Sequence, residues 1–192
     1  MINFKNATFV KSAPNVDERP PASLPEVLIV GKSNVGKSSL INVLTNKKSL
    51  AFTSKKPGHT KLLNYYDIDQ KFYLVDAPGY GYAVGGLDLD RLFGKMMDEY
   101  FQKATQLKLV LLLLDSRRTF KDNDLEILSY LRQYNIPFFV VVTKMDKINQ
   151  KEKAALNRHL QEMNITEGIY FTSSNIVRSL ESLKNGIENK LK

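Results

Sequence analysis

The sequence predicts an α/β domain with an open, mostly parallel sheet that is covered by helices on both faces. Two observations predict this class. Short apolar runs alternate with helix-like segments along most of the 192 residues, and every run is too short to span a bilayer. The Gly-rich stretch GKSNVGKS (31–38) also stands between an apolar run and a helix-like segment, as the turn after a parallel strand does.

The strands are predicted from their apolar character. Residues 4–10 suggest an edge strand, and four prolines after it keep the chain extended. The alternation in LLNYYDID and KFYLVD predicts a hairpin around Asp69-Gln70. Short apolar runs predict buried strands at 26–30, 107–115, 136–144 and 168–173.

Helices are predicted where apolar residues recur at helical spacing. Asp122 is expected to cap the helix that starts there. No linker divides the chain, so residues 26–192 are expected to form one domain on which residues 1–25 pack as an extension. Two loops are predicted, at 51–61 and 79–90, and the predicted helices are 38–47, 91–104, 122–134, 150–163 and 176–191.

Composition excludes several kinds of site. The chain has no cysteine, so disulfides, thiolate nucleophiles and Cys-ligated zinc are excluded, and His59 and His159 lack zinc-ligand spacing. The N-terminus lacks the apolar core of a signal peptide, so a cytoplasmic location without membrane insertion is expected. The net charge of +8 favours a polyanionic partner, such as RNA, DNA or an acidic membrane, although a solvated basic surface would give the same charge.

GKSNVGKS has the spacing of a phosphate-binding loop. Gly31 and Gly36 let the backbone curl so that successive N–H groups point at phosphate oxygens, and the next helix adds its positive end. Lys37 is expected to reach the β- and γ-phosphates, and Ser38 to offer its hydroxyl to Mg²⁺. The residues assigned to the phosphates here are Gly31, Lys32, Ser33, Asn34, Val35, Gly36, Lys37 and Ser38.

TKMD (143–146) predicts which base is bound. A lysine after a buried strand can lay its stem over a purine, and Asp146 can accept two hydrogens from guanine N1 and N2. Adenine has no such donor pair and would leave the carboxylate unpaired, so GTP is favoured over ATP. The residues assigned to guanine are Thr143, Lys144, Asp146, Thr172, Ser173 and Ser174.

Two further segments are predicted to close on the triphosphate. Asp76 ends the strand KFYLVD and is expected to bind Mg²⁺ through a water, while Gly79 presents its N–H to the γ-phosphate. In the PGHT segment, Thr60 is expected to give Mg²⁺ a second hydroxyl, and Gly58 and His59 to contact the phosphates. The predicted switch residues are Pro57, Gly58, Thr60, Asp76, Ala77, Pro78, Gly79 and Tyr80.

The ordered set GKSNVGKSSLIN, PGHT, DAPGYGYA, TKMD and FTSS resembles the EngB (YihA/YsxC) family of bacterial GTPases, within the TrmE–Era–EngA–EngB–septin class. His59 and Lys61 depart from the usual T-P-G-[RK]-T-Q, and Ala77 stands where Leu or Val is usual. The resemblance implies a P-loop NTPase G domain that hydrolyses GTP to GDP and phosphate. It also implies a role in assembly of the large ribosomal subunit and in cell division and septation.

The resemblance also concerns partners. The expected partners are GTP or GDP and the large ribosomal subunit or its precursor, bound by a monomer. The alternative is a nucleotide-regulated module that binds a division or membrane protein and hydrolyses little GTP. Residues that could contact ribosomal RNA, or simply be solvated charges, are Lys47, Lys48, Lys55, Lys56, Arg117, Arg118 and Lys121.

Tyr80 occupies the position where Ras-type GTPases hold a glutamine that orients water. Its side chain has no amide, so it can only stack, shield or point away. In related GTPases that lack this glutamine, an asparagine at the position of Asn34 helps to bind K⁺, which implies K⁺-assisted hydrolysis here. Asn34 could instead only stabilise the turn. Alternatively, the ribosome could supply the missing catalytic group, and GTP turnover by the protein alone would then be slow.

Overall fold

A computed structural model describes the chain except for residues 22–23, 53–61, 82–86, 166–167 and 174–176. It contains a seven-stranded sheet with the order β1-β3-β4-β2-β5-β6-β7. β2, β4, β5, β6 and β7 are parallel to one another, whereas β3 is antiparallel to both of its neighbours, β1 and β4. The strands are β1 Ala7–Ala13, β2 Glu26–Gly31, β3 Leu63–Ile68, β4 Phe72–Asp76, β5 Leu107–Asp115, β6 Phe138–Thr143 and β7 Ile169–Phe171.

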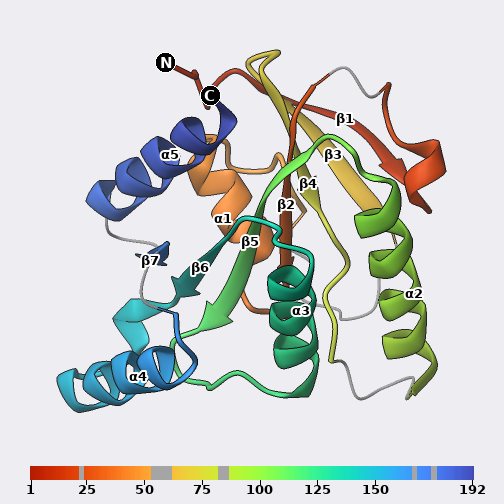
Figure 1. The fold of residues 1–192 in the computed structure, drawn as a ribbon. Coiled ribbons are helices and arrows are strands. Elements are labelled where there is room, and N and C mark those ends of the chain that lie inside the picture. Colours follow the sequence, from red (N-terminus) through yellow and green to blue (C-terminus); the bar gives the residue numbers. More distant parts are fainter. Residues whose placement is uncertain (22–23, 53–61, 82–86, 166–167, 174–176) are drawn as a thin grey trace.

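Helices cover both faces of this sheet, as the sequence predicts (Figure 1). α1 and α5 pack on one face, and α2, α3 and α4 on the other. None of the described helices is long and apolar enough to cross a bilayer. The helices are α1 Lys37–Leu44, α2 Leu87–Lys103, α3 Asp122–Gln133, α4 Gln150–Glu162 and α5 Val177–Leu191, and two 3-10 turns are η1 Val16–Glu18 and η2 Met145–Lys147.

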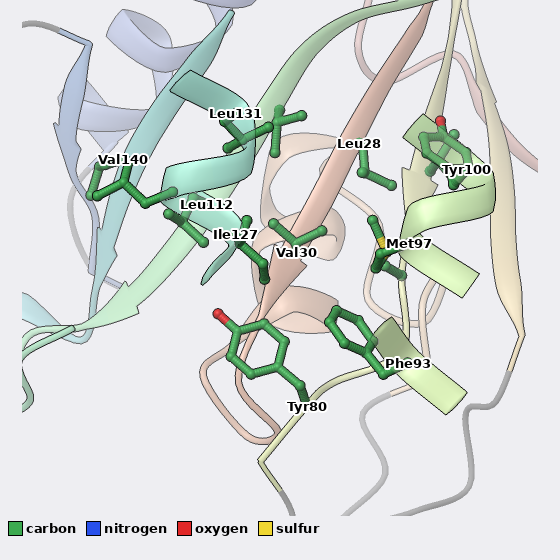
Figure 2. Close-up of a cluster of buried hydrophobic side chains, with 14 of the residues drawn as sticks. Leu28, Val30, Tyr80, Phe93, Met97, Tyr100, Leu112, Ile127, Leu131 and Val140 are labelled. Atoms are coloured by element: carbon green, nitrogen blue, oxygen red, sulfur yellow. The ribbon is translucent and has the colours of Figure 1, made fainter. Parts of the chain in front are cut away.

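β2 shows why the central strands read as continuous apolar runs. All six of its residues are buried, because helices cover both sides of a parallel sheet. Alternate side chains belong to different cores: Val27 and Ile29 face α1 and α5, whereas Leu28 and Val30 face α2 and α3. Figure 2 shows Leu28 and Val30 in the second of these cores.

The same topology gathers the polar ends of four strands at one edge. β2, β4, β5 and β6 run in one direction and end at Gly31, Asp76, Asp115 and Thr143. Ligands of open α/β sheets bind at this carboxyl edge, because the loops there diverge to the two faces. The candidate site is therefore built on rigid strand ends.

Several local predictions are wrong. The edge strand expected at 4–10 is Ala7–Ala13, and the segment expected to stay extended after it contains the 3-10 turn η1. The polar composition before Arg91 concealed the start of α2, which begins at Leu87. Asp122 is not the cap of α3 but already its first residue, and Lys121 has the extended backbone of the N-cap position. The Asp124 carboxylate instead accepts a hydrogen bond from the Lys121 N–H at 3.0 Å, which closes the first turn.

Candidate nucleotide-binding site

The segment that follows β2 has the backbone of a phosphate-binding loop. Asn34 and Gly36 have positive φ angles of 62° and 114°, so the chain curls before α1 begins at Lys37. A Cβ at Gly31 would meet Val35 Cγ1 at 2.8 Å, so this tight turn requires glycine. Val35 is buried and anchors the loop in the core, while Ser33, Lys37 and Ser38 remain partly accessible.

The TKMD segment is fastened directly to this loop. The Thr143 hydroxyl donates to the Val35 carbonyl oxygen at 2.7 Å, and Lys144 Nζ donates to the Asn34 carbonyl oxygen at 2.8 Å. Lys144 has a left-handed backbone, with φ of 59°. The Thr143 hydroxyl therefore stabilises the phosphate loop. Because it is used in this way, the guanine contacts predicted for TKMD depend mainly on Lys144 and Asp146.

Asp115 is a member of this site that sequence reasoning missed. Its carboxylate accepts hydrogen bonds from Lys144 Nζ at 2.9 Å and from Arg117 Nε and Nη2 at 2.9 and 2.8 Å. Burial raises the pKa of Asp115, but the bonds from Arg117 and Lys144 outweigh it and hold the pKa well below its usual range. The missed signal was an acid that ends a buried strand at the same sheet edge as Asp76.

Asp76 is buried at the end of β4 and lacks a complete set of partners. Its Oδ1 atom has no hydrogen-bond partner among the described residues. Burial raises its pKa to about 6, against the influence of the Lys37 ammonium, and burial likewise lowers the pKa of Lys37 against the influence of Asp76. A buried carboxylate with an unpaired oxygen beside a phosphate loop fits a hydrated Mg²⁺, with Ser38 in the first turn of α1 as a second ligand.

The DAPGY segment lies against the phosphate loop through its backbone. The Ser33 N–H donates to the Tyr80 carbonyl oxygen at 2.9 Å, and a Cβ added at Gly79 would meet Ser33 Cα and Oγ at 2.8 Å. The Ala77 N–H donates to the Ile29 carbonyl oxygen at 3.0 Å, which extends the β2–β4 pairing. Any movement at Gly79 must therefore be accommodated by the loop that would hold the phosphates.

The Tyr80 side chain points away from the phosphate loop. It is 3% exposed and packs on Phe93, with ring centroids 5.1 Å apart, between the sheet and α2 (Figure 2). Its hydroxyl donates to Asp124 Oδ1 at 2.5 Å, and burial together with the Asp124 charge raises the pKa of Tyr80 well above its usual range. Tyr80 is expected from the sequence to stack, to shield or to point away, and the structure shows that it points away.

The predicted guanine segments lie side by side. The Thr172 N–H donates to the Val142 carbonyl oxygen at 2.7 Å, and the Met145 N–H donates to the Thr172 carbonyl oxygen at 3.2 Å. The Asp146 side chain is 28% exposed, with Lys147 Nζ at 3.2 Å, and the Ser173 hydroxyl is buried without a partner in the described part of the chain. The predictions for Pro57, Gly58, His59, Thr60 and Ser174 fall outside the described residues.

Comparisons with known proteins agree with this arrangement. Residues 26–144 match a family model described as 50S ribosome-binding GTPase. A probable GTP-binding protein EngB from Prosthecochloris aestuarii is 40% identical over 189 residues, which cover 98% of each chain. The chain belongs to the EngB family of GTP-binding proteins. A second EngB relative, from Pelobacter propionicus, is 49% identical over 77% of this chain and 74% of its own length.

Solved structures support the EngB fold. A crystal structure of a probable GTP-binding protein EngB superposes with a TM-score of 0.66, at 24% identity, over 86% of this chain and 98% of that one. Era in complex with MgGDPNP and nucleotides 1506–1542 of 16S ribosomal RNA superposes with a TM-score of 0.60, at 25% identity, over 88% of this chain and 56% of Era. The P-loop GTPase fold and the resemblance predicted from the sequence are confirmed.

Proposed function

We propose that this EngB-family GTPase is a GTP-dependent switch that acts on the large ribosomal subunit during its assembly. The nucleotide part is supported by the buried Oδ1 of Asp76, which has no partner in the described ranges and lies at the sheet edge that also holds the phosphate loop and TKMD. The ribosomal part is supported by the description of the matching family model and by the net charge of +8.

Different residues of the site would bind different parts of the nucleotide. The curled backbone of residues 31–36 and the positive end of α1 would bind the phosphates, with Lys37 at the β- and γ-phosphates. Asp146 would accept the guanine N1 and N2 hydrogens, with the Lys144 stem against the base. Asp76, through water, and the Ser38 hydroxyl would hold Mg²⁺, which neutralises charge that develops on the phosphates.

The switch would depend on the contact between Gly79 and the phosphate loop. A γ-phosphate accepts hydrogen bonds, and the Gly79 N–H lies in the segment packed on Ser33. GTP would therefore order residues 76–80 and the PGHT segment with Thr60, and loss of the γ-phosphate would release them.

Hydrolysis would proceed without help from the Tyr80 side chain, because the Tyr80 hydroxyl is hydrogen-bonded to Asp124 in the core. We propose that K⁺ assists the reaction, with Asn34 as one ligand, by offsetting charge that develops in the transition state. Asn34 is exposed and has a left-handed backbone, which would equally suit a purely conformational role.

Replacing Asn34 by glycine separates these roles, because glycine keeps the left-handed turn and removes the amide. GTP turnover is measured in KCl and in NaCl at equal ionic strength. Faster turnover in KCl that Asn34→Gly abolishes is expected. Equal rates in both salts, or full K⁺ stimulation in the variant, would remove the K⁺ proposal.

The switch function is tested by co-sedimentation with purified large ribosomal subunits at physiological salt. Co-pelleting in the presence of a non-hydrolysable GTP analogue, and much less with GDP, is expected. Binding that ignores the nucleotide, or none at all, would instead favour a binding module for a division or membrane partner.

A further inference from the structure

A cavity lies at the carboxyl edge of the sheet, at the ends of β5 and β6 and beside α3 and α4. The positions of these four elements can be followed in Figure 1. Its volume is about 810 Å³, and its walls come from residues 32–35, the loop 115–121 and the first turns of α4. Lys37, Ser38, Asp76 and Asp146 do not line it. The cavity thus adjoins the nucleotide site through residues 32–35 and Lys144, and extends from there to the loop 115–121 and α4.

The acidic side chains in this cavity are already satisfied by the protein. Asp115 is bound by Arg117 and Lys144. Asp124 accepts from the Tyr80 hydroxyl and the Lys121 N–H, and Glu152 accepts from the Asn149 N–H at 2.8 Å. The lining carries five cations, Lys32, Arg117, Arg118, Lys121 and Lys144, against these three carboxylates, so its net charge is about +2.

The basic side chains are not all satisfied in this way. Within the described part of the chain, Lys32, Arg118 and Lys121 have no acidic partner within ion-pair distance. Arg118 and Lys121 are exposed, and Arg117 is half-exposed beside them. The cavity thus presents an uncompensated positive charge on a concave surface of fixed strand ends and helix starts.

We propose that this cavity binds the phosphate backbone of ribosomal RNA. The proposal rests on the proposed function, in which the partner is the large ribosomal subunit. Three of its cations, Lys32, Arg118 and Lys121, have no ion-pair partner among the described residues, which suits a polyanion that carries several phosphates. The proposal divides the predicted RNA contacts into two groups: Arg117, Arg118 and Lys121 lie together at this cavity, whereas Lys47 and Lys48 follow the far end of α1. Lys55 and Lys56 fall outside the described residues.

The test compares two double variants that each remove two positive charges. Arg118→Ala/Lys121→Ala empties the cavity rim without breaking a described side-chain contact. Lys5→Ala/Lys71→Ala removes two exposed lysines at the opposite end of the sheet, near the β3–β4 turn. Both GDP-bound proteins are titrated with protein-free large-subunit ribosomal RNA at several salt concentrations, and both are pelleted with large subunits in the GTP-analogue state.

The cavity variant is expected to bind the RNA about ten-fold more weakly, with a salt slope reduced by about two, and to pellet less with subunits. The control should match the wild type, and both variants should keep its GDP affinity and melting temperature. Equal losses in both variants, or unchanged RNA binding in the cavity variant, would overturn the proposal. Loss of subunit pelleting with intact RNA affinity would also overturn it and would indicate an acidic ribosomal protein.

This result is separate from the test of the proposed function. Wild-type protein that pellets with subunits under nucleotide control supports the switch even if the cavity variant pellets equally well. Wild-type protein that fails to pellet would reject the switch, and RNA binding by the cavity would then still be decided by the titration.

Discussion

Asp76 is the residue on which the chemistry of the site depends most. It combines deep burial, an oxygen without a hydrogen-bond partner among the described residues, and a pKa raised to about 6 by that burial. A carboxylate in this state is a poor contributor to stability and a good ligand for a hydrated cation. The protein without metal should therefore bear a cost that Mg²⁺ and nucleotide remove.

That cost should depend on pH. The folded-state pKa of about 6 lies above the ordinary value of 3.8, so the folded protein holds this proton more tightly than the unfolded chain does. This tighter proton binding stabilises the folded protein fully below about pH 4. Its contribution to the unfolding free energy, about 3 kcal/mol at most, is lost as the pH rises to about 6. Unfolding free energies measured in EDTA across this range should show the loss in the wild type. Asp76→Asn, which cannot titrate, should lack it, and parallel curves would contradict the assignment.

Tyr80 should matter for stability and not for the chemical step. Tyr80→Phe leaves a buried Asp124 oxygen without its donor, which should cost about 1.5–3 kcal/mol in urea unfolding. GTP turnover should remain within about two-fold of wild type, since the ring points into the core.

The matched control is Tyr134→Phe, at a tyrosine that is 56% exposed after α3. It should change the unfolding free energy by less than about 0.5 kcal/mol. A large fall in turnover for Tyr80→Phe at unchanged stability would mean that this tyrosine acts directly on the nucleotide.

At the scale of elements, the carboxyl ends of the strands work as one unit. The phosphate loop is held by Thr143 and Lys144 on one side and by the Gly79–Tyr80 backbone on the other. Lys144 in turn is held by Asp115 at the end of β5. In the proposed switch, a change at the nucleotide would reach residues 76–80 through these direct contacts.

Gly79→Ala tests the closest of these contacts. The added Cβ would lie 2.8 Å from Ser33 Cα, so the switch segment and the phosphate loop must separate. Nucleotide affinity should fall at least ten-fold, with a stability loss of about 1–3 kcal/mol. Isothermal titration with GDP and urea unfolding measure the two effects.

Gly94→Ala in α2 is the control, because nothing lies within 4 Å of its added Cβ. It should stabilise the protein by about 0.5–1 kcal/mol through helix propensity and leave GDP affinity unchanged. If Gly79→Ala binds GDP as the wild type does, then the loop contact is not under the steric constraint inferred here.

For the whole molecule, the sequence was sufficient to predict the parallel sheet, because buried strands covered on both faces are continuous apolar runs. It also predicted the hairpin around Asp69-Gln70, since alternation there marks two neighbouring strands. It could not predict the partner of Tyr80, because Asp124 is 44 residues away and only the packing of α3 brings the two together. The Asp115–Lys144 pair was missed for the same reason, although both residues follow buried strands.

The claim that these strand ends form a guanine-nucleotide site is tested most directly by exchanging the base preference. GDP, ADP and XDP affinities are measured by isothermal titration for the wild type and for Asp146→Asn. The wild type should prefer GDP strongly. The variant should lose about a hundred-fold in GDP affinity and gain XDP affinity, because an asparagine amide can donate to the xanthine C2 oxygen. Equal wild-type affinities for GDP and ADP, or unchanged GDP binding in Asp146→Asn, would contradict the account.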